Sequence, residues 1–135
     1  MNYIDANIFI YPLVNPINDE KLLLSNKILS QIVNNKLNSY TSYLTWDEFM
    51  HVLVKKLGKE EAIKEGEKFL RFPNLVFLKA DGNVIFRAQE LISKYNLKPR
   101  DAIHVATALI NGINHIISDD SDFDKITELK RIKLD

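Results

Sequence analysis

The chain has 135 residues, in which 18 Lys and Arg balance 18 Asp and Glu, with three His and no Cys. This length suits a single domain, and a hydrophobic content of 46% predicts a packed core rather than disorder. The absence of cysteine excludes disulfide frameworks, thiolate zinc sites and cysteine nucleophiles, and the balanced charge leaves any attraction for nucleic acid to local clusters.

In the first half of the chain, short runs of branched and aromatic residues alternate with apolar residues spaced three and four apart. This alternation predicts strands followed by helices. Pro12 and Pro16 are expected to break the first helix, and Gly58 is expected to end the third. The expected elements are a strand over 1–5, helices over 6–14 and 19–37, a strand over 39–43 and a helix over 45–57.

The second half continues the same alternation. Pro73 is expected to stop a helix, Asp81 and Gly82 to form a turn, and Pro99 to occupy the first turn of a helix. The expected elements are a helix over 60–72, a strand over 75–78, helices over 84–95 and 99–111, a strand over 115–117, a helix over 122–129 and a strand over 131–134.

Strands that alternate with helices indicate a mostly parallel sheet, because parallel neighbours need long crossover connections that are usually helical. We therefore predict an α/β fold, a three-layer α/β/α sandwich around a sheet of about five strands, with residues 1–135 as one domain.

The hydropathy pattern argues against a membrane protein. No apolar run approaches the roughly 18 residues that suggest a membrane span, and Asp5 lies where a secretory signal would need a basic start and an apolar stretch. The four glycines stand too far apart to build a phosphate-binding glycine loop. We expect a cytoplasmic protein without membrane contact.

Acidic residues gather where such a sheet presents its ligand-binding edge, at strand carboxyl ends and helix amino ends. Two carboxylates about 4 Å apart repel by about 4 kcal/mol at an effective dielectric of about 20, so acids that converge favour a bound cation. An all-oxygen site suits Mg²⁺ or Mn²⁺, which leave positions for a phosphate oxygen and an attacking water. The acids predicted at this edge are Asp5, Glu48, Asp101, Asp119, Asp120 and Asp122.

Most of these acids also have a purely structural interpretation. Thr45 and Glu48 match a capping box, and for Glu48 the two interpretations stay open. Asp101 in a first helical turn is favoured by the helix dipole. Residues 118–122 resemble a solvated loop in which one acid caps the next helix, and Asp5 could end a strand at the surface, although a functional role is favoured there.

Some histidine and aromatic residues near the same edge are ambiguous. His104, three residues after Asp101, is expected to pack on the buried side of its helix, with metal ligation as the alternative. Trp46, Tyr3 and Tyr43 could stack on nucleic-acid bases, but packing is the favoured interpretation.

Four segments, taken in order, resemble the PIN-domain ribonucleases. In size and motif order the chain is similar to the toxin half of a VapBC-type toxin–antitoxin pair. The segments carry a D-x-N motif, a strand and turn that reach a glutamate, a D-A-x-x-x-A helix and an [ST]-x-D-x-D-F turn. They cover residues 3–7, 41–48, 99–109 and 118–123.

The resemblance implies a metal-dependent endoribonuclease whose acids hold one or two Mg²⁺ or Mn²⁺ ions. The four ligand acids would be Asp5, Glu48, Asp101 and Asp120, with Asp122 as an auxiliary metal ligand. The family spacing selects Asp120 over Asp119. Asn7 and Ser118 match polar positions that could orient a carboxylate or a water.

The resemblance also implies partners. RNA would be the substrate, with Lys98 and Arg100 as candidate phosphate contacts. The apolar helices expected over 19–37 and 45–57 could supply a homodimer face or a groove for an antitoxin helix. Two alternatives stay open: a PIN-like module that binds RNA or protein without catalysis, and a receiver-like signalling domain that is phosphorylated on an acid.

Overall fold

A computed structural model describes residues 1–134 of the chain. Within these residues, the strands form one sheet in the order β3-β2-β1-β4-β5, and every neighbouring pair is parallel. The strands are β1 (Asn2–Ile4), β2 (Ser39–Ser42), β3 (Leu75–Leu78), β4 (His115–Ile117) and β5 (Lys130–Ile132). Strand β1 therefore lies at the centre of the sheet, with β2 on one side and β4 on the other.

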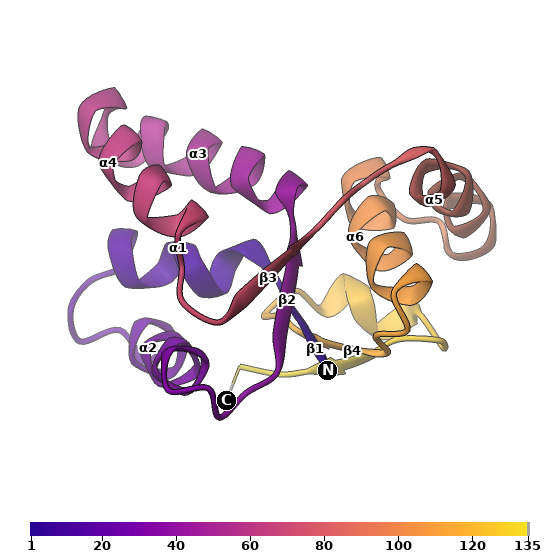
Figure 1. Cartoon of the computed structure of the whole chain (residues 1–135), viewed down its shortest axis with the longest axis horizontal. Coiled ribbons are helices and arrows are strands. Elements are labelled where there is room, and N and C mark those ends of the chain that lie inside the picture. The colour runs from indigo at the N-terminus through magenta and orange to yellow at the C-terminus, as the bar shows by residue number, and fades with distance from the viewer. Residues whose placement is uncertain (135) are drawn as a thin grey trace.

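Helices cover both faces of this sheet. Figure 1 shows α1 to α4 on one side and α5 and α6 on the other. Their bounds are α1 (Ala6–Val14), α2 (Glu20–Val33), α3 (Tyr43–Leu57), α4 (Lys59–Leu70), α5 (Gly82–Tyr95) and α6 (Pro99–Ile110), and a short 3₁₀ helix, η1 (Ser121–Lys125), follows β4. The predicted three-layer sandwich is confirmed.

Two hydrophobic cores fill the spaces between the layers, because alternate strand residues face opposite sides of a sheet. Tyr3 and Ile116 lie in the core shared with α5 and α6. Their neighbours Ile4 and Ile117 lie in the core shared with α1 to α4. All four side chains are at least 96% buried, so β1 and β4 are anchored from both faces and their ends are held in place.

Several predicted boundaries differ from the structure. Helix α1 continues through Pro12, because the helix is anchored by the buried side chains of Ile8, Phe9 and Ile10, and it ends before Pro16. Helix α2 stops at Val33, where Asn34 and the positive φ of Asn35 redirect the chain before the predicted end. The predicted helix over 122–129 is only the short 3₁₀ turn η1.

Within residues 1–134, no helix combines the length and the apolar character that a membrane crossing needs.

Candidate metal centre

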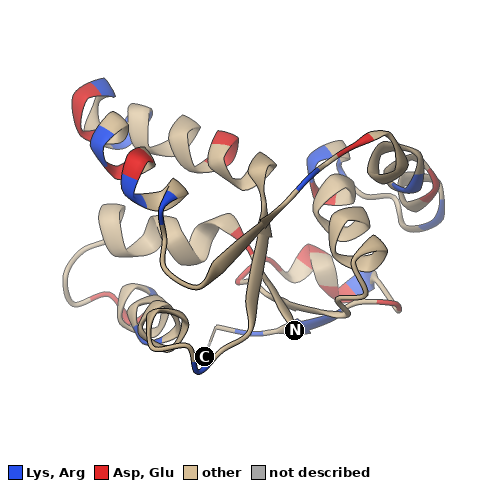
Figure 2. Ribbon diagram, viewed as in Figure 1, with Lys and Arg blue, Asp and Glu red and all other residues tan. Residues whose placement is uncertain are grey.

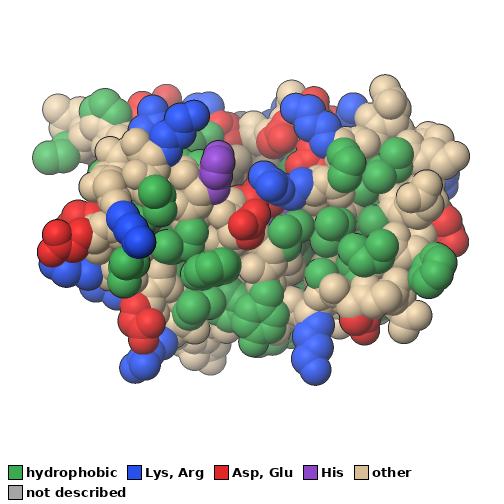
Figure 3. Space-filling view, turned by 90° about the horizontal axis from the view of Figure 1, so that it is seen from above, with side chains coloured by type: hydrophobic (Ala, Val, Ile, Leu, Met, Phe, Trp, Pro, Cys, Tyr) green, Lys and Arg blue, Asp and Glu red, His purple; other side chains and the backbone are tan. Residues whose placement is uncertain are grey.

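A cleft of about 240 Å³ opens at the carboxyl end of the sheet. Four of its lining side chains are carboxylates, which come from the end of β1, from α3, from α6 and from the loop after β4. In Figure 2, acidic positions of the ribbon lie on both sides of the sheet. Seen from above, acidic, basic and histidine side chains gather near the middle of this face, with hydrophobic side chains around them (Figure 3). The lining residues are Asp5, Ala6, Asn7, Ile10, Glu48, His51, Val52, Arg100, Asp101 and Asp120.

Asp5 lines this cleft directly after β1, and it is buried. One oxygen caps α1 by accepting from the Ala6 amide at 2.8 Å, and the other accepts from the Ser118 hydroxyl at 2.5 Å and from the Asn7 amide at 3.4 Å. Burial raises the pKa of Asp5, and the nearby Glu48 raises it further, against the opposing effects of His104 and Ser118. Burial therefore outweighs the stabilisation that the hydrogen-bond donors and His104 give to the ionised carboxylate.

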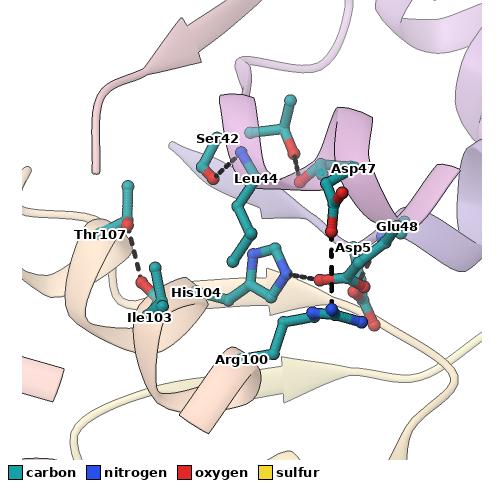
Figure 4. A network of polar contacts seen from close by, with 12 residues as sticks. Asp5, Ser42, Leu44, Asp47, Glu48, Arg100, Ile103, His104 and Thr107 are labelled. Atoms are coloured by element: carbon teal, nitrogen blue, oxygen red, sulfur yellow. Dashed lines mark hydrogen bonds and ion pairs between the residues drawn. The ribbon is translucent and has the colours of Figure 1, made fainter. Parts of the chain in front are cut away.

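Glu48 reaches the cleft from α3, and the capping-box interpretation, one of the two left open for this residue, does not hold. The helix begins two residues earlier than expected, because the Ser42 hydroxyl accepts from the Leu44 amide at 2.9 Å and supplies the cap. Thr45 is buried instead and shares a hydrogen bond of 2.7 Å with Thr41. The Glu48 carboxylate is thus free of the helix start and points into the cleft (Figure 4).

Glu48 accepts a hydrogen bond from Nε2 of the buried His104, and Nδ1 of the same ring contacts the Tyr3 hydroxyl at 2.5 Å. Burial lowers the pKa of His104, but Tyr3 and Glu48 more than offset this effect and raise it to about 10. His104 packs in the core as predicted, but its polar contact with Glu48 was not predicted. Suitable atoms of Asp5, Glu48 and His104 lie within 4.8 Å of one another.

A second group of acids completes the cleft. Carboxylate oxygens of Asp101, Asp120 and Asp122 also lie within 4.8 Å of one another. Burial raises the pKa of Asp101 to about 6, and the charges of Asp120 and Asp5 contribute. Asp120 caps η1 by accepting from the Asp122 amide at 2.9 Å, as expected for one acid of this loop. The Asp120 amide in turn donates to Ser118 at 3.0 Å.

Asp119, the neighbour of Asp120, belongs to a different network. It accepts from the Tyr11 hydroxyl at 2.8 Å and pairs with Lys21. These hydrogen bonds and Lys21 lower its pKa in spite of partial burial. Of these two neighbours, Asp120 lines the cleft and Asp119 does not.

The basic residues predicted beside the cleft differ in their positions. Arg100 lines the cleft and pairs with Asp47 at 3.5 Å, with both side chains 56% exposed (Figure 4). Lys98 is exposed at the start of α6 but is not a lining residue. Sequence reasoning missed His51 in the cleft, although its position three residues after Glu48 would put it on the same face of α3.

The aromatic residues that were considered for base stacking have different environments. Tyr3 is fully buried and is not accessible to a base. Tyr43 is exposed but stacks on Phe77, with ring centroids 5.3 Å apart. Trp46 is 39% exposed.

The donor set fits a hard divalent cation. The cleft offers carboxylate oxygens from two groups of acids, and repulsion among them would be relieved by positive charge. Within residues 1–134, the Asn7 Oδ1 atom is buried without a hydrogen-bond partner, and a water carried by such a cation could donate to it.

A family model described as the PIN domain matches residues 3–129. The chain belongs to the PIN domain family. This membership confirms the predicted resemblance and sets aside the receiver-like alternative. The PIN domain is similar to Ribonuclease VapC6 of Methanocaldococcus jannaschii, with 29% identity over 138 residues that cover 87% of this chain and 88% of the relative.

Two solved structures share the fold of this PIN domain. One is the Mycobacterium tuberculosis toxin VapC20, described as cleaving the sarcin-ricin loop, with a TM-score of 0.74 and 14% identity over 92% of this chain and 93% of that one. The other is the DNA-bound VapBC of Salmonella typhimurium, with a TM-score of 0.75 and 16% identity over 99% of this chain and 98% of that one. Both matches extend over nearly the full PIN domain.

Proposed function

We propose that this PIN domain is a metal-dependent endoribonuclease of the VapC type, which hydrolyses phosphodiester bonds in RNA. The observation that carries the proposal is the meeting of Asp5, Glu48, Asp101 and Asp120, from four separate stretches of the chain, in one cleft. The ribonuclease name of the similar archaeal protein supports the reaction class. We further propose that residues 1–135 form one nuclease unit.

The four acids would hold one or two Mg²⁺ or Mn²⁺ ions, with Asp122 as an auxiliary ligand beside Asp101 and Asp120. When bound, the cation neutralises charge that develops on the phosphate and makes a water more acidic for in-line attack. Ser118 fixes Asp5 by donating to it, and Asn7 offers the buried Oδ1 atom that could orient a water.

Arg100 and Lys98 would contact RNA phosphates. The Arg100–Asp47 pair is long and exposed, so it contributes little to stability and the guanidinium is available to a phosphate at the cleft. Lys98 precedes α6 and would extend the basic contact beyond the cleft.

The chain would work in the cytoplasm as a homodimer with a small antitoxin protein as its partner. The similarity to a VapBC complex supports the antitoxin. A cavity of about 180 Å³ on the α1 to α4 side, lined mainly by apolar side chains, offers space for side chains of an apolar helix. The cavity is lined by Phe9, Pro12, Leu13, Leu29, Phe49, Glu65, Lys68, Phe69 and Phe72.

Cleavage of a labelled RNA tests the proposal. We expect cleavage with Mg²⁺ or Mn²⁺ and none with EDTA. The cleavage rate should fall by at least about 100-fold in the Asp5→Asn and Asp101→Asn variants, since each substitution removes the charge of a metal ligand. Glu61→Gln, on an exposed part of α4, is the matched control and should cleave like the parent. Undiminished cleavage by either folded cleft variant would refute the assignment, and a parent that binds RNA without cleaving it would favour the non-catalytic module.

A further inference from the structure

We infer that His104 is a positioning residue of the metal centre, which holds Glu48 through Nε2 while Tyr3 holds the imidazole, and that His104 is not itself a metal ligand. The inference rests on the proposed function, because it concerns the orientation of a ligand acid. It assigns a role to a buried pair, Tyr3 and His104, that neither the motifs nor the cleft lining assigns.

The first support is where the three side chains come from. His104 lies on α6, Tyr3 on β1 and Glu48 on α3, and Figure 1 shows α3 and α6 on opposite sides of the sheet. The imidazole therefore links the central strand and both helical layers at the point where the acids meet (Figure 4). A contact with this placement can fix the distance between the two sides of the cleft.

The second support is burial. His104 is 1% exposed and Tyr3 is 0% exposed, and their rings meet edge to face with centroids 5.6 Å apart. Buried polar groups need hydrogen-bond partners, because water cannot satisfy them. The Tyr3 hydroxyl and both imidazole nitrogens satisfy one another and Glu48, so the ring has one orientation in which all are paired.

The third support is the protonation of the His104 nitrogen that donates to Glu48. An ionised carboxylate can only accept, so Nε2 must carry the proton that it shares with Glu48. A nitrogen that carries a proton has no lone pair to give to a cation. Nδ1 is engaged by Tyr3 at 2.5 Å. The atoms of Asp5, Glu48 and His104 lie within 4.8 Å, but only the two carboxylates remain able to bind the metal.

The consequence is that one oxygen of Glu48 is anchored and the other is left for the cation. Partners of this kind behind metal ligands typically contribute about 10- to 100-fold in metal affinity. We therefore expect His104 to act on metal binding through Glu48, with no direct effect on RNA binding.

Mn²⁺ titration of the full chain, followed by electron paramagnetic resonance, tests the inference with two substitutions at one position. His104→Phe keeps a ring of similar volume but has no donor, and should weaken Mn²⁺ binding about 10- to 100-fold. His104→Gln keeps an N–H near the place of Nε2 and should retain most of the affinity. His115→Gln, on β4 and outside the cleft lining, should bind Mn²⁺ like the parent.

Tyr3→Phe provides a second test that preserves the packing of the core. It removes only the hydroxyl that holds Nδ1, and should lower Mn²⁺ affinity in the same direction as His104→Phe but by less. In RNA cleavage at saturating Mn²⁺, Tyr3→Phe and His104→Phe should each reach the kcat of the parent, with the KM for RNA unchanged. Circular dichroism confirms that each variant is folded.

Two results would overturn the inference. Nitrogen hyperfine coupling to the bound Mn²⁺, present in the parent and lost in His104→Phe, would make His104 a ligand. Equal Mn²⁺ affinity in the parent and a folded His104→Phe variant would leave it a packing residue. A parent that binds Mn²⁺ but cleaves no RNA would contradict the proposed function alone, whereas a parent that binds no Mn²⁺ would overturn both.

Discussion

Ser118 is a small residue on which two acids depend. Its hydroxyl donates to Asp5 at 2.5 Å and accepts from the Asp120 amide at 3.0 Å, and the side chain is fully buried. Ser118→Ala would leave the buried Asp5 carboxylate short of a donor. Because unsatisfied buried groups cost about 1–3 kcal/mol, we expect a loss of stability of this size.

The same variant should lose about 10- to 100-fold in metal affinity, because Asp5 would no longer be fixed. Urea unfolding and Mn²⁺ titration measure the two effects. Ser93→Ala, at an exposed position of α5, is the control that should change neither. Parent-like metal binding by Ser118→Ala would show that Asp5 needs no such support.

Asp101 gives a prediction about pH in the absence of metal. Its pKa is raised from 3.8 to about 6, chiefly by burial, so the folded protein holds this proton more tightly than the unfolded chain. The stability that the protonated group contributes is complete below the unfolded value and is lost as pH rises through about 6. Above that range the ionised carboxylate no longer favours the folded state.

The Asp101→Asn variant has no proton to lose at this position, so its stability does not fall as Asp101 ionises in the parent. In EDTA, its melting temperature relative to the parent should therefore rise between about pH 5 and about pH 7.5, by roughly 2–4 °C. Excess Mg²⁺ should reduce or reverse the difference, since only the parent keeps the carboxylate ligand. Calorimetric scans at the two pH values check this, and a difference that stays constant with pH would show that the pKa of Asp101 is not raised in the folded protein.

At the level of elements, the first two turns of α6 place three residues at or beside the cleft. Arg100 and Asp101 line the cleft, and His104 contacts Glu48 from the buried side. Pro99 fixes the residue at which α6 begins, and this sets the directions in which the three side chains point. A shift of the helix start by one residue would misplace all of them.

The basic residues at the start of α6 should act on RNA affinity. Arg100→Ala and Lys98→Ala should each raise the dissociation constant for RNA and reduce the slope of its dependence on salt by about 1, because each removes one phosphate contact. Fluorescence titration of labelled RNA at several salt concentrations, in EDTA, measures this. Lys64→Ala on the exposed face of α4 should have no effect. Equal effects of all three substitutions would mean that RNA does not bind at the cleft.

The sequence predicted which edge of the sheet carries the acids better than it predicted the helix boundaries. Alternating strands and helices were sufficient to place Asp5, Glu48, Asp101 and Asp120 at one edge, because parallel sheets bring strand carboxyl ends together. The start of α3 was mispredicted because two possible caps stand close together. Ser42 and Thr45 both suit a cap, and only the burial of Thr45 against Thr41 decides between them.

The contacts of His104 could not be predicted from the sequence, for a different reason. Helical spacing placed it on the buried side of α6, but its partners Tyr3 and Glu48 lie 101 and 56 residues away in the chain. Sequence periodicity describes one helix at a time. It contains no information about which distant side chain meets a buried polar atom, so this contact requires the tertiary structure.

Taken together, the two helical layers meet at one acidic cleft, and a bound cation should join them. A ligand that binds only the folded state stabilises it by about 2.7 kcal/mol at 100 times its dissociation constant. Mn²⁺ should therefore raise the melting temperature of the parent by several degrees, and should leave an Asp5→Asn, Asp101→Asn double variant unchanged. A similar rise in both proteins would indicate that Mn²⁺ binds elsewhere.

Anomalous diffraction from a crystal soaked in Mn²⁺ tests the metal centre most directly. We predict an anomalous peak in the cleft, coordinated by carboxylate oxygens of Asp5 and Asp101 and by at least one of Glu48 and Asp120, with the His104 imidazole outside the coordination shell. A well-ordered cleft without a peak at saturating Mn²⁺, or a peak bound only by other side chains, would contradict the account.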